Sequence, residues 1–331
     1  MIRIKNLLKD DSGAVMVLVA LALVVLLGCM ALVIDAGVVY AERMKASNVM
    51  DAAVLAGVSE LPEYHDDPYE YDSWNLASQY IVKNGFDPNY VEFIPDDPND
   101  SGKHTSIKLK YTGTQDFLFA RVLGPGFDEA EVKAAAKARV GNVGGFGPGN
   151  GVIPIGIDES EMPPFTEGSN PSFVIKEGGG GGDTGWYGYV NIDGKNITKD
   201  IVPGIQYGSE NPVSIGQVLP VVPGNKHAEG IREAMSERLN GCTHDPECGI
   251  DGYVLGCRKI VYVPIGYKDD GGGATGRFTV TGFAALLLVE RWEEDANQAF
   301  RGEFLQHIAA SNAYIDDSAE DFGVYATELC E

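Results

Sequence analysis

The chain has 331 residues with 48 Asp and Glu against 25 Lys and Arg, and its formal net charge of −23 disfavours nucleic-acid binding, because contact with phosphates requires a basic surface. Hydrophobic residues make up 44% of the chain, which excludes a disordered acidic tail and is sufficient for a buried core. Glycine (42) and proline (17) are abundant without a three-residue period, which excludes collagen and predicts many turns between short β-strands.

The first element predicted along the chain is a transmembrane helix at residues 14–34, which contain no charged side chain. At ~1.5 Å per residue this helix spans roughly 31 Å, close to the ~30 Å hydrocarbon thickness of a bilayer. A cleaved signal peptide is the alternative, but its apolar segment is shorter and ends in an A-x-A site, whereas the A-x-A here lies in mid-segment at 20–22. Basic residues at positions 3, 5 and 9 favour a cytoplasmic N-terminus, residues 1–13, and an extracellular or periplasmic location for the part that follows the anchor.

Residues 35–60 are expected to extend the anchor as an amphipathic stalk helix. The segment is rich in helix formers, and no proline occurs before Pro62, so a continuous helix is predicted from about residue 14 to residue 58. Apolar residues such as Val39 and Met50 alternate with charged residues such as Glu42 and Asp51. This pattern predicts one face that packs against protein and one face that meets solvent.

Small and polar residues at fixed spacings form a motif along this predicted helix. It consists of a Gly before the apolar run, Asp-x-Gly-x-x-Tyr at its outer end, and Asp-Ala-Ala about eleven residues later: Gly13, Asp35, Gly37, Tyr40, Asp51, Ala52 and Ala53. The combination resembles the N-terminal module of TadG-like proteins of the Tad (Flp) pilus assembly system. The resemblance implies a single-pass membrane protein whose partners are other Tad pilus assembly components and pilin.

Two departures from related patterns refine this expectation. A pilin cut by prepilin peptidase would carry Glu at the fifth position after the Gly, where this chain has Leu18. A von Willebrand A domain, which some TadG-like proteins carry, would need Asp-x-Ser-x-Ser, and the nearest string at 316–320 lacks the second Ser. We therefore expect a permanently anchored accessory protein, with a minor pilin as an alternative, and we expect no von Willebrand A domain.

The region beyond the stalk is expected to be β-rich. We divide it into a first outer α+β segment at 61–141, a Gly/Pro hinge at 142–151 and a β-rich outer domain at 152–331. A short helix is expected to end at Asn84 and Gly85, and a second is expected between Lys226 and Leu239. Alternating strands are expected at 105–111 and 132–140, and further strands at 152–157, 172–176, 186–192, 258–266 and 278–292. The predicted fold class is α+β, with a long N-terminal helix before a β-rich outer region.

Four of the five cysteines lie beyond the anchor, at Cys242, Cys248, Cys257 and Cys330. An even number in an oxidising exterior favours two disulfides, with Cys242 paired to Cys248 or Cys257. The alternatives are free thiols and a metal site that includes His244. The metal site is less favoured because the spacing lacks the paired C-x₂₋₄-C units of structural zinc sites.

The sequence contains no recognisable catalytic motif, so an enzyme is not expected. Acidic strings at 96–100 and 191–196 allow calcium binding but lack the EF-hand pattern, and no cofactor is expected. The leading hypothesis is a non-enzymatic, membrane-anchored accessory protein of Tad pilus assembly or anchoring that acts by protein–protein contacts. A membrane-anchored surface enzyme or a carbohydrate-binding protein is the alternative from another functional class.

Overall fold

The computed structural model describes residues 11–63, 71–99, 102–149, 151–164, 170–176, 180–182, 185–194, 198–222, 228–269, 276–294 and 297–330. The first ten residues of the expected cytoplasmic segment therefore lie outside the described part of the chain. The helices are α1 (Asp11–Val58), α2 (Asp72–Lys83), α3 (Thr198–Tyr207) and α4 (Ala228–Leu239), with 3-10 turns η2 (Pro88–Tyr90), η3 (Ala120–Leu123) and η4 (Glu159–Glu161).

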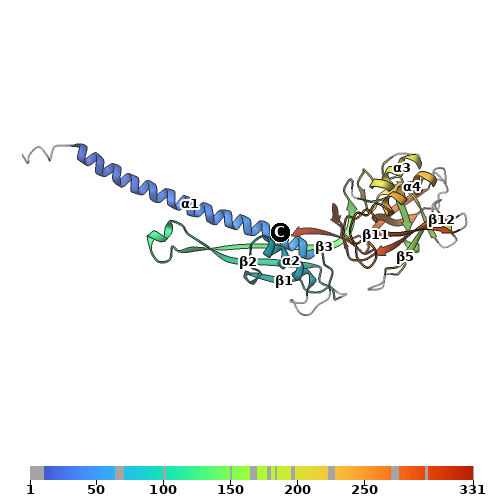
Figure 1. Ribbon diagram of the computed structural model, residues 1–331, viewed down its shortest axis with the longest axis horizontal. Coiled ribbons are helices and arrows are strands. Elements are labelled where there is room, and N and C mark those ends of the chain that lie inside the picture. Colours follow the sequence, from blue (N-terminus) through green and yellow to red (C-terminus); the bar gives the residue numbers. More distant parts are fainter. Residues whose placement is uncertain are drawn as a thin grey trace, which may run out of the picture.

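The strands outnumber the helices and follow α1 along the chain, which confirms the predicted α+β class. They are β1 (Val91–Pro95), β2 (Ser106–Asp116), β3 (Glu129–Phe146), β4 (Ile155–Asp158), β5 (Ser172–Lys176), β6 (Gly180–Gly182), β7 (Gly185–Tyr189), β8 (Val213–Ser214), β9 (Val218–Pro220), β10 (Ile260–Lys268), β11 (Arg277–Glu294), β12 (Asn297–Leu305), β13 (Ile308–Ala309), β14 (Ala313–Ile315) and β15 (Val324–Cys330). They form two sheets, and α1 projects from the body as a single long rod (Figure 1).

Helix α1 runs without interruption through the expected anchor and stalk. Its 48 residues span about 72 Å at ~1.5 Å per residue. In the N-terminal half the apolar side chains face outward, with Leu18 and Val24 each 66% exposed. Within the described ranges, α1 is the one helix that is long and apolar enough to cross a membrane. The predicted continuous helix is confirmed, and among the described residues the large side chains of its apolar half are mostly exposed.

The outer half of α1 packs against the first sheet. Ala46, Met50, Ala53 and Val54 are fully buried, and their three- and four-residue spacing places them on one helix face. That face meets buried residues of α2, β2, β3 and β15: Ala77, Ile81, Ile107, Leu109, Val132, Ala136, Ala138, Val140 and Tyr325. We call this assembly of the outer half of α1, α2 and the first sheet the first module.

The first sheet has the strand order β1-β2-β3-β15-β13. Strands β2 and β3 form an antiparallel hairpin whose register runs from Ser106 opposite Arg139 to Asp116 opposite Glu129. In β3, Val132, Ala136 and Val140 are buried while the intervening lysines are exposed. The alternation predicted a strand here, and the structure confirms it. Ala and Lys favour a helix intrinsically, but burial of one strand face outweighs that preference.

The first residues of the expected hinge at 142–151 belong to a strand. Strand β3 continues to Phe146, where its last residues pair with β8 and β14. The glycines of this stretch permit close packing, since a Cβ on Gly145 would lie 2.6 Å from Tyr314 Oη. Strand β15, from the expected outer domain at 152–331, pairs with β3 and completes the first sheet. The two parts are therefore joined by shared strands.

The second sheet has the order β5-β12-β11-β10-β4-β7-β6, with β9 paired to β11. Its long central strands β10 and β11 carry fully buried residues such as Val263 and Leu286. Helix α4 packs Ile231 and Met235 into the same core, as the apolar spacing predicts, although residues 226 and 227 of the expected helix lie outside the described ranges. We call the second sheet with α3 and α4 the second module (Figure 1).

Candidate functional site

The carboxylate of Asp35 is the central group at the junction between the anchor helix and the β2–β3 hairpin. Its Oδ1 accepts hydrogen bonds from the backbone N–H groups of Leu118 at 2.7 Å and Phe119 at 3.2 Å. Its Oδ2 accepts from Phe119 at 3.1 Å and Ala120 at 2.6 Å. Three consecutive backbone donors thus converge on one buried carboxylate, which is a strong charge-assisted arrangement.

This contact fixes where the hairpin ends relative to the membrane anchor. Asp35 follows directly after the charge-free segment 14–34 and is only 2% exposed. The hairpin runs back along α1 toward its N-terminal half, and η3 at the hairpin tip lies beside the helix (Figure 1). The tip is therefore held at the level where the apolar half of α1 begins.

Two opposing effects set the acidity of Asp35. Burial raises the pKa of the carboxyl, while the hydrogen bonds from Ala120, Leu118 and Phe119 and the charge of Arg121 lower it, and the net shift is downward from the ordinary 3.8. A carboxylate with a lowered folded-state pKa contributes stability that is present above its unfolded pKa and is lost as pH falls through the folded value.

The contact between the tip and α1 is therefore expected to open only in acid. Hydrogen exchange of the Leu118 and Ala120 amides, normalised to unfolded-peptide rates, is expected to stay constant from neutral pH to about 5 and to rise below 3.8. Asp35→Asn is expected to exchange faster at neutral pH and to lose this dependence. Equal, pH-independent protection in both proteins would contradict the assignment.

The tip exposes large apolar side chains to solvent. Leu118 is 61% exposed, Phe119 46%, Val122 90% and Phe127 47%. Between the tip and α1 lies a groove of about 500 Å³ whose lining includes Leu32, Val39, Tyr40, Phe117 and Phe127. This apolar surface is continuous with the apolar half of α1.

The remaining motif residues take different positions along α1. Gly13 lies in the first turn of the helix, and a side chain at Gly37 would meet no atom within 4 Å. Tyr40 is 67% exposed beside the groove. Asp51 is half-buried, Ala52 is exposed, and Ala53 is fully buried against the first sheet. Of the sequence motif, Asp35 and Ala53 therefore contact the outer region, while Tyr40 lines the groove beside that contact.

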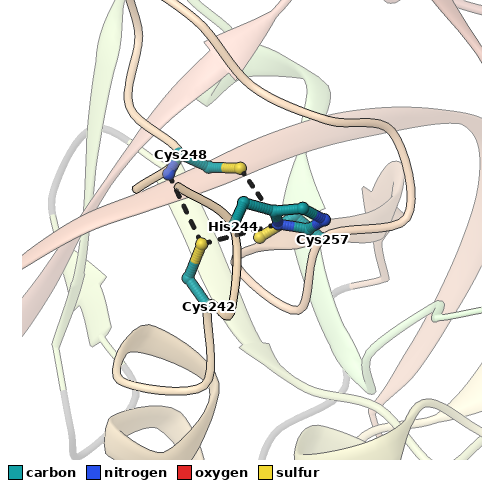
Figure 2. A group of neighbouring side chains, drawn as sticks. All are labelled: Cys242, His244, Cys248 and Cys257. Carbon is teal, nitrogen blue, oxygen red and sulfur yellow. Dashed lines mark hydrogen bonds between the residues drawn. The ribbon is translucent and has the colours of Figure 1, made fainter. Parts of the chain in front are cut away.

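The cysteines fall into two places. Cys242, Cys248 and Cys257 lie with His244 in the loop between α4 and β10, and their ligand atoms are all within 4.8 Å of one another (Figure 2). Cys330 ends β15 in the first sheet, opposite Lys137 of β3. All of these cysteines are free thiols in the structure, so the two predicted disulfides stay a prediction.

The thiols of the loop have different acidities. Backbone N–H groups of Cys248 and His244 donate hydrogen bonds that lower the pKa of Cys242 to about 6. Burial raises the pKa of Cys257 to about 11. From the sequence, a metal site at these residues is a less favoured alternative, because their spacing lacks the paired units of structural zinc sites, and the loop brings together positions up to fifteen residues apart.

The acidic strings considered for calcium are partly engaged within the protein. Asp96 accepts hydrogen bonds from the Thr105 backbone N–H at 3.0 Å and from its hydroxyl at 2.9 Å. Asp193 accepts from the Asn211 N–H at 3.0 Å. Residues 100, 195 and 196 of these strings lie outside the described ranges, and calcium binding stays a prediction.

Comparison with known proteins bears on the anchor and stalk. Residues 13–60 match a family model described as putative Flp pilus-assembly TadE/G-like. Searches of curated proteins and of solved structures gave no match. The matched segment contains the whole sequence motif from Gly13 to Ala53 and nearly all of α1. The resemblance seen in the sequence is thus confirmed: residues 13–60 are similar to the TadE/G-like family of putative Flp pilus-assembly proteins.

Proposed function

We propose that this protein is a permanently anchored, non-enzymatic accessory protein of Tad (Flp) pilus assembly or anchoring that acts through protein–protein contacts. The observation that carries the proposal is the family match over residues 13–60, on a helix whose apolar half is unpartnered and whose outer half is built into a folded module. Because the outer half of α1 packs into the first module, a contact made by the outer region would be coupled to the membrane anchor.

The charge distribution supports an orientation with the N-terminus in the cytoplasm. Arg3, Lys5 and Lys9 precede the anchor, and the excess of acid lies entirely beyond residue 35. An acidic outer region limits adhesion to an anionic membrane surface and self-association. The acidic charge therefore favours an outer region that does not contact the membrane surface, except at its apolar hairpin tip.

The hairpin tip is proposed to rest in the membrane interface. Leu118, Phe119, Val122 and Phe127 are exposed next to the outer end of the membrane span, where apolar side chains gain stability from burial among lipids. With Asp35 holding the tip, this second contact would restrict tilting of the outer region relative to the bilayer.

Lipid-based photolabelling tests this contact on the full chain in nanodiscs. Phospholipids that carry a photoreactive group near the headgroup are expected to label the peptide around Val122. The control peptide contains Val254 and Leu255, which are 49% and 50% exposed in the second module and are expected to stay unlabelled. Val122→Asp is expected to reduce labelling at the tip severalfold. Equal labelling of the two peptides would contradict the membrane contact.

Fractionation of cells separates a permanently anchored protein from a minor pilin. The chain is expected in the membrane fraction with residues before Gly13 intact, as mass spectrometry of the N-terminus would show. A mature chain that begins at Ala14 and is recovered in sheared filaments would contradict the accessory role and favour the minor pilin.

A further inference from the structure

The loop between α4 and β10 contains four metal-ligand side chains that converge on one point (Figure 2). We propose that Cys242, His244, Cys248 and Cys257 bind one structural Zn²⁺ ion. Three cysteines and one histidine form a closed tetrahedral ligand set of the kind that zinc uses for structural sites. With all four positions filled by protein, such a site stabilises the fold and leaves no open position for catalysis.

The distances match those of a tetrahedral zinc site. Zn–S bonds of about 2.3 Å and Zn–N bonds of about 2.0–2.1 Å place a sulfur and a nitrogen ligand about 3.5 Å apart. The Sγ atoms of Cys242 and Cys248 lie 3.6 Å and 3.4 Å from His244 Nδ1. These two sulfur–nitrogen distances already fit a tetrahedral site, and the full set, whose ligand atoms lie within 4.8 Å of one another, has to contract slightly to surround an ion.

The backbone of the loop also supports sulfur ligands. The N–H of Cys248 donates to Cys242 Sγ at 3.4 Å, and the N–H of Val254 donates to Cys248 Sγ at 3.4 Å. Hydrogen bonds of this kind orient metal-bound sulfurs and offset part of their negative charge. These two hydrogen bonds fix the side chains of Cys242 and Cys248, and their donors come from different parts of the loop.

A buried lysine lies close to the proposed site. Three thiolates, one neutral imidazole and Zn²⁺ sum to a charge of −1. The ammonium group of Lys259, whose side chain is 8% exposed, donates to the carbonyl oxygen of Cys248 at 3.2 Å and pairs with Glu247 at 2.5 Å. This ammonium group, two residues after Cys257, is a positive group beside the proposed site, but Glu247 already balances its charge.

The proposal also accounts for how a long irregular loop is held in the core. No helix or strand is assigned between α4 and β10, yet Cys248 and Cys257 are 4% and 3% exposed within a hydrophobic cluster that residues of both modules form. Cys242 lies three residues after the end of α4, and Cys257 lies three residues before the start of β10. A bound ion would therefore close the loop and tie the helix to the sheet.

Disulfides are the competing arrangement. Any single disulfide within the group would consume two thiols and leave the third thiol and His244 without a role. A second disulfide would require Cys330, which ends β15 in the first sheet and is not among the clustered ligands. One zinc ion uses all four clustered side chains.

Metal analysis of the purified full chain in detergent tests the proposal. One zinc per chain is expected after exhaustive dialysis without added metal. Cys257→Ser and His244→Ala are expected to lower the zinc content roughly tenfold or more, because loss of a ligand removes more affinity than loss of an outer-shell partner. The matched control Cys330→Ser is expected to retain the metal.

A ligand variant could lose zinc simply because it fails to fold. X-ray absorption spectroscopy of the unmodified protein avoids this problem, because it reports the zinc ligands directly. Three sulfur ligands at about 2.3 Å and one imidazole nitrogen are expected around the zinc. Absence of metal together with a mass lower by two hydrogen atoms per disulfide would overturn the proposal. Zinc that persists unchanged in both ligand variants would also overturn it.

Discussion

Replacing Met50 with alanine is expected to lower the free energy of unfolding of the first module by about 2–5 kcal/mol. Met50 is fully buried at the centre of the contact between α1 and the first sheet. The truncation removes apolar contacts and leaves a cavity in the hydrophobic cluster that also contains Val54 and Ile107. Denaturant titration of the full chain, followed by fluorescence of Trp74 in the same cluster, measures the loss.

Met44 provides the matched control, because it lies on the same helix and is 46% exposed. Met44→Ala is expected to change the free energy of unfolding by less than about 0.5 kcal/mol. In cells, Met50→Ala is expected to impair pilus formation more than Met44→Ala, since the first variant weakens the link between the anchor and the outer region. Equal stability of the two variants would show that α1 does not pack as described.

Replacing Phe146 with alanine is expected to destabilise the joint between the two modules by about 3–5 kcal/mol. Phe146 is fully buried at the end of β3, with its ring centroid 4.9 Å from Tyr262 and 5.1 Å from Phe283. The edge-to-face contact with Phe283 adds to the effect of burial. Chemical denaturation monitored by circular dichroism measures the change.

Tyr207 is the control for this substitution because its ring is 67% exposed at the end of α3. Tyr207→Ala is expected to leave the unfolding midpoint within the error of the wild-type value. If Phe146→Ala also left it unchanged, the stretch 142–146 would be a true hinge and the shared-strand description of the joint would be wrong.

Local patterns in the sequence were sufficient to predict much of the fold. The charge-free run at 14–34 and the absence of proline before Pro62 predicted α1, because length and helix propensity are local properties. The alternation at 132–140 predicted β3, and the apolar spacing at 226–239 predicted α4. In each case the signal lies within one segment and needs no knowledge of distant partners.

The contacts that define the candidate site are not local, and the sequence did not predict them. Asp35 was identified as a motif residue, but its hydrogen-bond partners lie 83–85 residues away in the hairpin tip. The Gly-rich stretch at 142–151 indicated a hinge, whereas burial of Val143 and Phe146 keeps its first half in a strand. The convergence of three cysteines and His244 depends on the path of an irregular loop, which spacing alone does not determine.

The central claim is that this anchored protein serves assembly of Tad-type pili. The most direct measurement is the number of pili per cell in a strain that lacks the gene, counted by electron microscopy beside the same strain complemented with the wild-type chain. Loss or strong reduction of pili, restored by the wild-type chain, is the expected result. Normal numbers of pili and normal adhesion in the strain without the gene would contradict the account.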